Sequence, residues 1–494
     1  MYPPVFLLVL SMLIILSGIF YAISLPKGFP CNIPVIPFWR HTLDVAKGMS
    51  RADLYNTRIR EPIEKHGAVA RWHEGRWTIL VTKPEFLVQI FKESRGPLTR
   101  QGFYHRVPGG YTAQFFGENI IDSDGDLHNV FVKLLRPGIL RPVNITRMRE
   151  MSQLLVQKLL RDQQAVFASG IGCHIGSQVW HWAVDVFGEF FLDTQMDDLD
   201  YSQTAVQKIL GARNQSFIGR FRDHFPVIEQ LPYTFDISKR TRARLNKLED
   251  TIVGHAERRL QKGPPLPGDE NKLIFLLNRA RKSGLISDFH YRSNLNQLFV
   301  AGHENVETTL VAAMLELATR PDLQDRLFVE VSENLPIDYV PDDLDKLPLL
   351  SAVIYETLRL YPPLGTLTNR RTTEPFSLGP DILIPPGTFM GWHAYGVHTD
   401  PQLWGANARE FDPDRWGTDS RAVHSMFRSQ QVTGRYIPFS LHSRRCLGVT
   451  FALTQLRVVL CELVRRLEWE LSPDHVFAFS KIVLDVRDMF LGFT

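Results

Sequence analysis

Cysteine is scarce in this chain of 494 residues, which has only Cys31, Cys173, Cys446 and Cys461. These four residues lie far apart, and no two of them form a CxxC pair. Small secreted proteins that depend on disulfides use many closely spaced cysteines. The scarcity therefore argues against a disulfide framework and indicates a reducing compartment.

An excess of either charge is also lacking. The 56 lysines and arginines nearly balance 53 aspartates and glutamates, so the formal net charge is +3. We find no lysine and arginine cluster of the kind that binds nucleic acid, and we expect no nucleic-acid partner. The 33 glycines and 31 prolines are close to ordinary usage, so no large disordered region is expected.

The first 26 residues contain no charged side chain. Within them, residues 5–23 are apolar and would span about 28 Å as a helix at ~1.5 Å per residue, enough to cross a hydrocarbon core of about 30 Å. A cleaved signal peptide is the alternative, but such peptides have a basic start and a shorter apolar core. We therefore expect an uncleaved membrane anchor over residues 1–25.

The residues after this run indicate its orientation. Lys27 and Arg40 follow the run and no basic residue precedes it, so the rest of the chain is expected in the cytosol. Four prolines between positions 25 and 39 cannot continue a helix. Residues 26–45 are therefore predicted to be a stiff hinge between the membrane and a body formed by residues 46–494.

Within the predicted body we find neither a second long linker nor an internal repeat. Apolar residues recur at helical spacing in four long segments, residues 148–160, 240–260, 287–320 and 448–467. Strand-like segments such as 76–83 and 381–388 are short and few. The pattern predicts one large, mainly α body with a small β region.

A first chemical pattern lies in residues 350–363, where Glu356 and Arg359 are three positions apart and share a helix face. Such a pair is usually exposed and contributes only a few tenths of a kcal/mol. The apolar surroundings argue against exposure in this case. Arg415 could complete a buried charged cluster, which is stable only when every partner is present.

A second pattern is the helix predicted over residues 294–321, which contains Gly302 next to Glu304 and Asn305. A glycine in the middle of a helix costs about 1 kcal/mol relative to alanine, so it needs a reason. Close approach of a flat ligand is one reason, and tight packing between helices is the other.

A third pattern surrounds Cys446, which follows Arg444 and Arg445 and precedes a predicted helix starting near Gly448. This basic setting predicts a depressed thiol pKa. A nucleophile would need a base, for which His442 is available. An iron ligand would need cationic groups for haem propionates, which suits Arg444. A lone cysteine is otherwise a small core residue.

Taken in order, the segments AGHEN, ETLR and FSLHSRRCLG resemble those of the cytochrome P450 superfamily of haem-thiolate monooxygenases. The intervals also fit, with 52 residues from Glu304 to Glu356 and 87 from Arg359 to Cys446. The anchor and hinge resemble the microsomal type, and AGHEN resembles members of fungal secondary metabolism. The resemblance implies a single large triangular fold, mainly α, in the endoplasmic reticulum membrane with one span and a cytosolic catalytic domain.

The resemblance also implies roles for individual residues. Cys446 would bind the iron of haem b. The propionate partners would be Arg444, Arg370 and His128, and Phe439 would shield the thiolate. Glu304 and Asn305 take the place of the catalytic acid–alcohol pair. The residues implied to have a structural role are Glu356, Arg359 and Arg415.

Three positions depart from the family pattern. Val132 replaces a usual arginine, leaving Lys133 or Arg136 to supply that contact. His442 replaces the glycine of the cysteine signature. Asn305 replaces a threonine, and an amide can donate a hydrogen bond and hold a water but is a poor proton carrier.

The segment of residues 101–120 is implied to cover the distal haem face. Its aromatic residues Phe103, Tyr104, Phe115 and Phe116 suit a flat guest, although the same residues could simply pack the loop. The resemblance adds the residues around Phe299 and Ala301, together with residues 364–368 and 477–479, to the substrate pocket.

By the resemblance, the reaction would insert an oxygen atom of O2 into a small, aromatic or amino-acid-derived metabolite, or couple it oxidatively. Electrons would come from NADPH through an NADPH–cytochrome reductase, with cytochrome b5 as a further donor. The alternatives are a haem-thiolate isomerase or dehydratase that uses no O2, a non-enzymatic haem-binding protein, and a cysteine hydrolase without haem.

Overall fold

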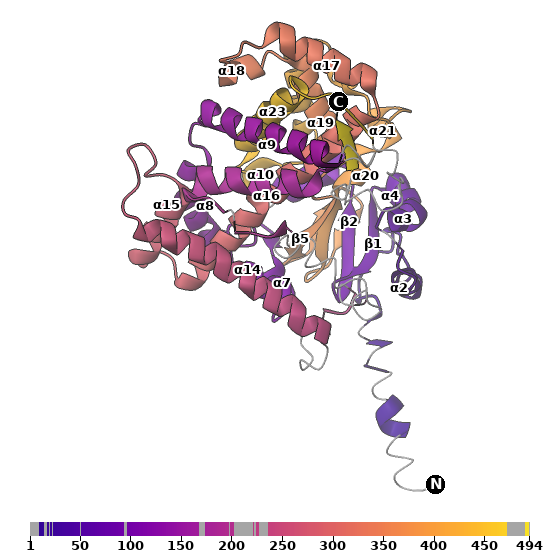
Figure 1. Ribbon diagram of the computed structural model, residues 1–494. Helices are drawn as coiled ribbons and strands as arrows, with labels where there is room; N and C mark the ends of the chain where they lie inside the picture. Colours follow the sequence, from indigo (N-terminus) through magenta and orange to yellow (C-terminus); the bar gives the residue numbers. More distant parts are fainter. Residues whose placement is uncertain are drawn as a thin grey trace.

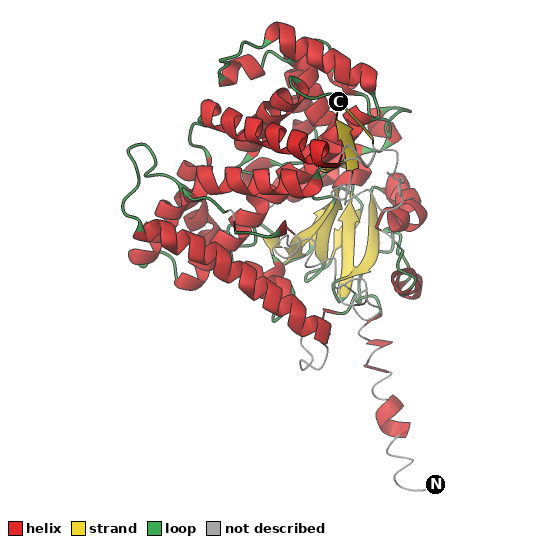
Figure 2. Ribbon diagram, in the orientation of Figure 1, coloured by secondary structure: helices red, strands yellow, loops and turns green. Residues whose placement is uncertain are grey.

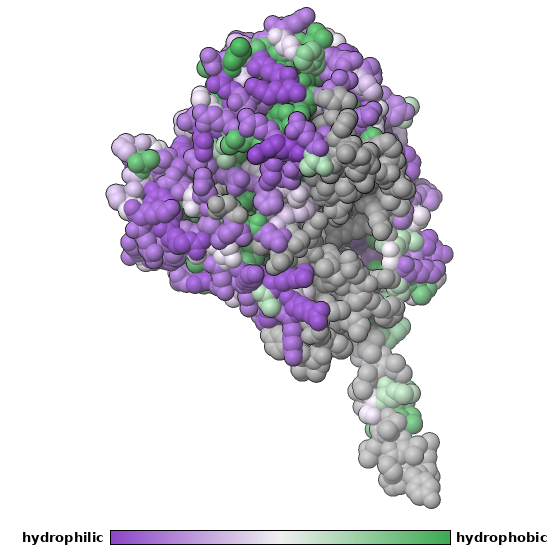
Figure 3. Space-filling view, viewed as in Figure 1, coloured by the Kyte–Doolittle hydropathy of each residue, from purple (hydrophilic) through white to green (hydrophobic). Residues whose placement is uncertain are grey.

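The computed structural model describes residues 9–13, 17–18, 20–21, 23–49, 51–92, 96–166, 173–196, 198–201, 221, 224–226, 236–471 and 490–493 (Figures 1 and 2). Helices make up most of this part, and the strands gather on one side (Figure 2). The mainly α fold with a small β region is therefore confirmed. On the face seen in Figure 3, hydrophilic residues cover most of the described surface.

The central element is α16 (Asp288–Ala318). It begins where the Ser287 hydroxyl accepts a hydrogen bond from the backbone N–H of His290, and it ends before Pro321. From Val306 to Ala318 every side chain is buried, including the polar side chains of Glu307 and Glu316.

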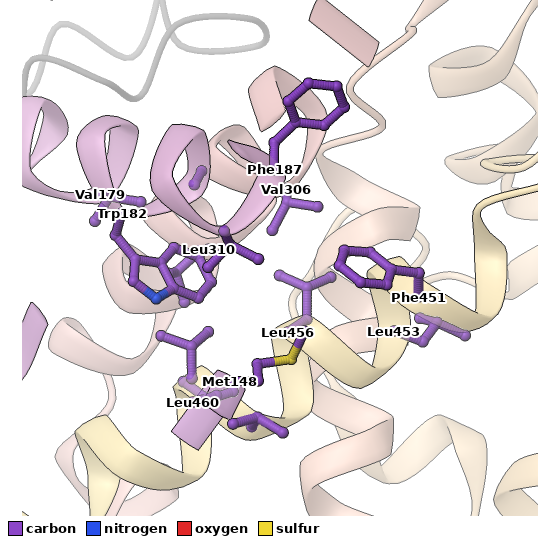
Figure 4. Close-up of a cluster of buried hydrophobic side chains, with 14 of the residues drawn as sticks. Met148, Val179, Trp182, Phe187, Val306, Leu310, Phe451, Leu453, Leu456 and Leu460 are labelled. Carbon is purple, nitrogen blue, oxygen red and sulfur yellow. The ribbon is translucent and has the colours of Figure 1, made fainter. Parts of the chain in front are cut away.

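Helices α10 (Gly176–Phe187), α19 (Pro348–Leu360) and α23 (Val449–Val464) pack against α16, and α9 (Ile145–Val166) packs against α10 and α23. In the core cluster, Val306 and Leu310 of α16 lie close to Phe451 and Leu456 of α23 (Figure 4). This packing brings the first turn of α23 next to the middle of α16.

The main sheet has the strand order β1-β2-β8-β5-β3. These strands are β1 (Ala68–His73), β2 (Arg76–Val81), β8 (Phe389–His393), β5 (Thr366–Thr372) and β3 (Leu98–Arg100). Only β2 and β8 run parallel, and β5 has an irregularity between Thr368 and Arg370. The antiparallel register of β3 and β5 pairs Arg100 with Arg370.

Smaller elements complete the described fold. The other strands are β4 (Cys173–His174), β10 (Phe490–Phe493) and β9 (Trp469–Leu471) in one sheet and β6 (Phe376–Leu378) and β7 (Ile382–Ile384) in another. The other helices are α2 (Phe38–Ala46), α3 (Arg51–Leu54), η1 (Tyr55–Ile59), α4 (Arg60–His66), α5 (Pro84–Lys92), α6 (Phe103–Arg106), α7 (Tyr111–Phe116), α8 (Gly125–Ile139), η3 (Gly188–Leu192), α14 (Asp236–Gln261), α15 (Leu273–Lys282), α17 (Pro321–Asn334), α18 (Pro341–Leu344), α20 (Ala394–His398), α21 (Pro401–Trp404), η5 (Pro413–Trp416), α22 (Ser420–Val432) and η6 (His442–Arg444).

The predicted helices at residues 148–160, 240–260, 287–320 and 448–467 correspond to α9, α14, α16 and α23. Residues 38–45 of the predicted hinge are helical, as part of α2. The described residues include no helix that is long and apolar enough for a membrane span. Because only part of residues 5–23 is described, the membrane anchor stays a prediction.

Candidate functional site

Cys446 lies in the short loop that enters α23. Its backbone N–H donates to the carbonyl of Phe439 at 2.8 Å. The backbone N–H of Gly448 points at the Cys446 sulfur, and a Cβ placed on Gly448 would lie 3.8 Å from it. Phe439 is half-buried against the hydrophobic core. The loop thus presents the sulfur at a helix N-terminus, where negative charge is stabilised.

The depressed thiol pKa predicted from the two arginines is wrong. Cys446 is exposed, but desolvation by nearby protein atoms raises the pKa of its thiol, while the Gly448 N–H and the charge of Arg445 act to lower that pKa. The side chains of both arginines are engaged elsewhere. Arg444 forms an ion pair with Asp124, and Arg445 donates to Gln431 Oε1 at 3.2 Å.

Three arginines gather beside this loop. Arg370 is buried, with 1% of its surface exposed, and its Nη1 donates to Asn369 Oδ1 at 2.7 Å. Its Nε and Nη2, and the Nε of half-buried Arg100, have no hydrogen-bond partner within the described residues. Burial lowers the pKa of Arg370, as do the nearby charges of Arg100 and then Arg444. Because these guanidinium groups repel one another, a bound anion between them would stabilise the cluster.

Asp124 organises this arginine cluster. Its carboxylate pairs with Arg444 and accepts the backbone N–H of Arg100 at 2.7 Å. Arg444 also donates to the carbonyl of Ser123 at 3.2 Å. Burial, followed by the repulsion from Arg444, lowers the pKa of Arg100 to about 10. A single carboxylate therefore holds two of the three arginines in place.

His128 lies beside the arginine cluster. Its Nδ1 lies 3.1 Å from the carbonyl of Ile120, and because a carbonyl only accepts, Nδ1 carries the proton. Burial, and then the charge of Arg444, lowers the pKa of His128 to about 4. The neutral ring can offer only an acceptor at Nε2, so His128 would donate to a carboxylate only after taking a second proton.

Glu356, Arg359 and Arg415 form the buried cluster that their spacing suggested. Arg359 donates to both oxygens of Glu356 at 2.7 and 2.8 Å, and Arg415 Nε donates to Oε1 at 2.9 Å. The indole N–H of Trp416 and the backbone N–H of Asp412 also donate to Glu356. Glu356 and Arg359 are fully buried, so the exposed-pair interpretation is excluded.

His398 is a residue that the sequence patterns did not reveal. Its Nε2 accepts the backbone N–H of Ile437 at 2.8 Å, which leaves Nδ1 to donate to the carbonyl of Arg359 at 3.1 Å. His398 thereby ties α19 to the chain that leads into the Cys446 loop. Both partners are 39 positions away, so no local pattern could have revealed this link.

Gly302 is explained by helix packing. A Cβ at this position would lie 2.3 Å from Phe187 Cδ2 of α10, so the close helix contact requires glycine. Glu304 is buried, whereas Asn305 is partly accessible. The Asn305 side-chain N–H donates to the carbonyl of Ala301 at 3.3 Å.

Of the residues predicted to line a substrate pocket, some are buried in the structure and others are accessible. Phe115 and Phe116 are buried in the core, as is Phe299, so these three rings pack the protein interior. The more accessible ones are Phe103, Tyr104, Ala301 and Leu364. Residues 477–479 lie outside the described residues.

Comparison with known proteins bears on this arrangement. The pattern of the family described as Cytochrome P450 matches residues 31–482. The chain belongs to the cytochrome P450 family. Members of this family are haem enzymes in which a cysteine thiolate binds the iron.

Two fungal relatives match this cytochrome P450 over most of its length. It is 32% identical over 471 residues to cytochrome P450 monooxygenase xanG of Aspergillus fumigatus, covering 94% of this chain and 86% of the relative. It is 28% identical over 480 residues to cytochrome P450-DIT2 of Saccharomyces cerevisiae, covering 95% of this chain and 94% of the relative.

The fold agrees with the same family. The crystal structure of the cytochrome P450DA heme domain matches 91% of this chain and 94% of its own, with a TM-score of 0.69 and 19% identity. The described side chains also suit a haem. The propionates of a haem are anions, and Arg100 and Arg370 hold unpaired N–H groups beside Arg444, two positions from Cys446.

Proposed function

We propose that this chain is a membrane-anchored haem-thiolate monooxygenase that acts on a small metabolite. One observation carries the proposal, namely an arginine cluster with unpaired N–H groups next to a cysteine at a helix N-terminus. The cluster supplies positive charge for two propionates, and the cysteine supplies the iron ligand. Oxygen insertion or oxidative coupling of an aromatic or amino-acid-derived molecule is the activity that we infer.

Each residue of the cluster has a task in this proposal. Cys446 binds the iron, while Arg100, Arg370 and Arg444 hold the propionates of haem b. When bound, the haem supplies the activation of O2, which electron donation from the thiolate favours. Phe439 covers the sulfur from the core side, and the Gly448 N–H stabilises its negative charge.

Proton supply is the step in which this chain differs from the family pattern. Asn305 replaces the usual alcohol, and its side-chain N–H is held by the Ala301 carbonyl. An amide does not release a proton near neutral pH, so protons must come through water, through Glu304 or from the substrate. His128 is a propionate contact in this proposal only in its doubly protonated form.

We further propose that residues 1–25 anchor the chain in the endoplasmic reticulum membrane, with the catalytic domain in the cytosol. The uncharged run and the basic residues that follow it support this orientation. Trp39 and Leu43 of α2 are 59% and 51% exposed, which suits contact with a lipid interface close to the anchor.

Electrons are proposed to come from NADPH through a cytochrome reductase or cytochrome b5. Arg445, which directly precedes Cys446, and Lys133 of α8 are both exposed and carry positive charge. Such charge attracts an acidic partner and raises its rate of association.

The deciding experiment compares the full-length chain with its Cys446→Ser variant in membranes. The wild type should bind haem and show the carbon monoxide difference band of a thiolate-bound haem, and Cys446→Ser should lose that band. Exposed Cys31 provides the control, since Cys31→Ser should keep the band. An unchanged band in the Cys446→Ser variant would refute the ligand assignment.

A second candidate function is an isomerase or dehydratase that uses bound haem without O2. The replacement of the proton-carrying alcohol by Asn305 is the observation that favours it. Product formation that continues without NADPH and under anaerobic conditions would establish this candidate over the monooxygenase.

A further inference from the structure

Helix α16 is accessible on one face over a short stretch. The partly accessible residues that share this face are Gln297, Leu298, Ala301, Gly302 and Asn305. On the same face, buried Asn294 closes the stretch at one end, because its Oδ1 accepts the backbone N–H of Ile120. Buried Thr308 closes the other end. The open stretch is therefore only about 12 Å long, at ~1.5 Å per residue.

This stretch lies near the cysteine end of α23. Val306, the residue after Asn305, belongs to the same core cluster as Phe451, which is in the first turn of α23 (Figure 4). Beyond Val306 the remaining side chains of α16 are buried. Asn305 is thus the last polar side chain on α16 that a small molecule in this region can reach.

The hydrogen bonds of this turn fix the direction of the Asn305 amide. A backbone carbonyl accepts and never donates, so the amide nitrogen must face Ala301 O and the amide oxygen must face away. The backbone around it is also braced. Thr308 and Thr309 donate to the carbonyls of Glu304 and Asn305, both at 2.8 Å.

We propose that Asn305 is a specificity-determining residue that accepts, through Oδ1, a hydrogen bond from an O–H or N–H group of the substrate. The inference rests on the haem enzyme proposed above and adds the class of its substrate, a small molecule with a phenol, alcohol or N–H donor. The amide divides two tasks between two atoms, since nitrogen binds the helix and oxygen binds the ligand. A ligand without a donor would leave Oδ1 desolvated and unpaired.

The test uses haem absorbance to titrate pairs of probes that differ only in the donor. The pairs are 4-ethylphenol with 4-ethylanisole and indole with 1-methylindole. Wild type should bind the donor of each pair about three- to tenfold more tightly, the range of one neutral hydrogen bond. Asn305→Leu, similar in size but without polar atoms, should abolish the preference, and Asn305→Thr should reduce it.

Gln297→Leu is the matched control, because it removes an amide from the same face two turns away and should keep the preference. A preference that survives in Asn305→Leu would overturn the inference, and so would a preference that is undiminished in Asn305→Thr where the leucine variant does not fold. So would a wild type that shows no preference or no response to either donor. If the wild type binds no haem, the proposed function itself fails. If an Asn305 variant binds haem normally and discriminates between the paired probes as the wild type does, only the role of Asn305 is refuted.

Discussion

Arg100 and Arg370 stand opposite each other on the antiparallel strands β3 and β5. Each has a guanidinium nitrogen that lacks a hydrogen-bond partner among the described residues. Paired like charges on neighbouring strands destabilise a sheet unless an anion lies between them. The repulsion between Arg100 and Arg370 therefore destabilises the folded protein, and bound propionates would offset this repulsion.

Arg370→Gln should have opposite effects on the protein with and without haem. Removing one of three mutually repelling cations should raise the unfolding free energy of the haem-depleted protein by about 1–2 kcal/mol. The same change should weaken haem retention by roughly tenfold, because a charge-assisted hydrogen bond is lost. Urea unfolding and haem transfer to apomyoglobin measure the two effects.

Arg371→Gln is the control for this prediction. Arg371 is exposed and lies over the ring of Phe389 at 5.4 Å, outside the arginine cluster. It should leave haem transfer unchanged. A loss of stability in haem-depleted Arg370→Gln would show that the cluster is not strained by its own charge.

Glu356→Gln should strongly destabilise the protein. The amide keeps the size of the side chain but leaves Arg359 and Arg415 without a counter-charge in a fully buried place. Breaking one partner of a buried ion pair costs about 3–5 kcal/mol. Chemical unfolding measures the loss. Glu410→Gln should have little effect, since Glu410 contributes only its backbone carbonyl to Arg359.

His442→Gly should stabilise the cysteine loop. His442 has φ of +52°, in the left-handed region that costs a side chain about 1–2 kcal/mol. Glycine removes this strain but adds freedom to the unfolded chain, so a net gain of about 0.5–1 kcal/mol is expected. Ser440→Gly, at φ of +57°, should act in the same direction. A lower thermal midpoint in both variants would contradict the prediction.

Stability should fall on mild acidification. Burial, the largest cause in each case, lowers the pKa of His398 and of His393 to about 3. Between pH 6.5 and 3 the unfolded chain binds protons that the folded chain does not, so the unfolding free energy declines as pH falls. Each residue should contribute a loss of about 2 kcal/mol between pH 7 and 5.

His398→Asn tests the assignment of this pH effect. The variant should be less stable at pH 7, because the link from Arg359 to Ile437 is weakened. Between pH 5 and 6, the pH dependence of its unfolding free energy should also correspond to nearly one proton fewer taken up on unfolding than in the wild type. Urea unfolding at a series of pH values measures both, and an unchanged slope would remove His398 from the pH dependence.

Local spacing was enough to predict several parts of the site. Positions three apart share one face of a helix, so the spacing of Glu356 and Arg359 alone predicts that they pair. Cys446 could likewise be assigned to the start of a helix. Other features depend on distant segments. Arg100 was missed because its partner Arg370 comes from a strand 270 positions later, and only the register of β3 and β5 joins them.

The sequence by itself therefore determined the family, the mainly helical class and the cysteine that stands at its centre, because these follow from residue order and periodicity. Only the tertiary structure decided which atoms face each other. It showed that Gly302 packs against Phe187, that Arg444 pairs with Asp124, and that protein atoms near the exposed Cys446 desolvate its thiol, so that the pKa rises instead of falling. Electrostatics and close packing depend on distances between segments, and sequence spacing does not specify those distances.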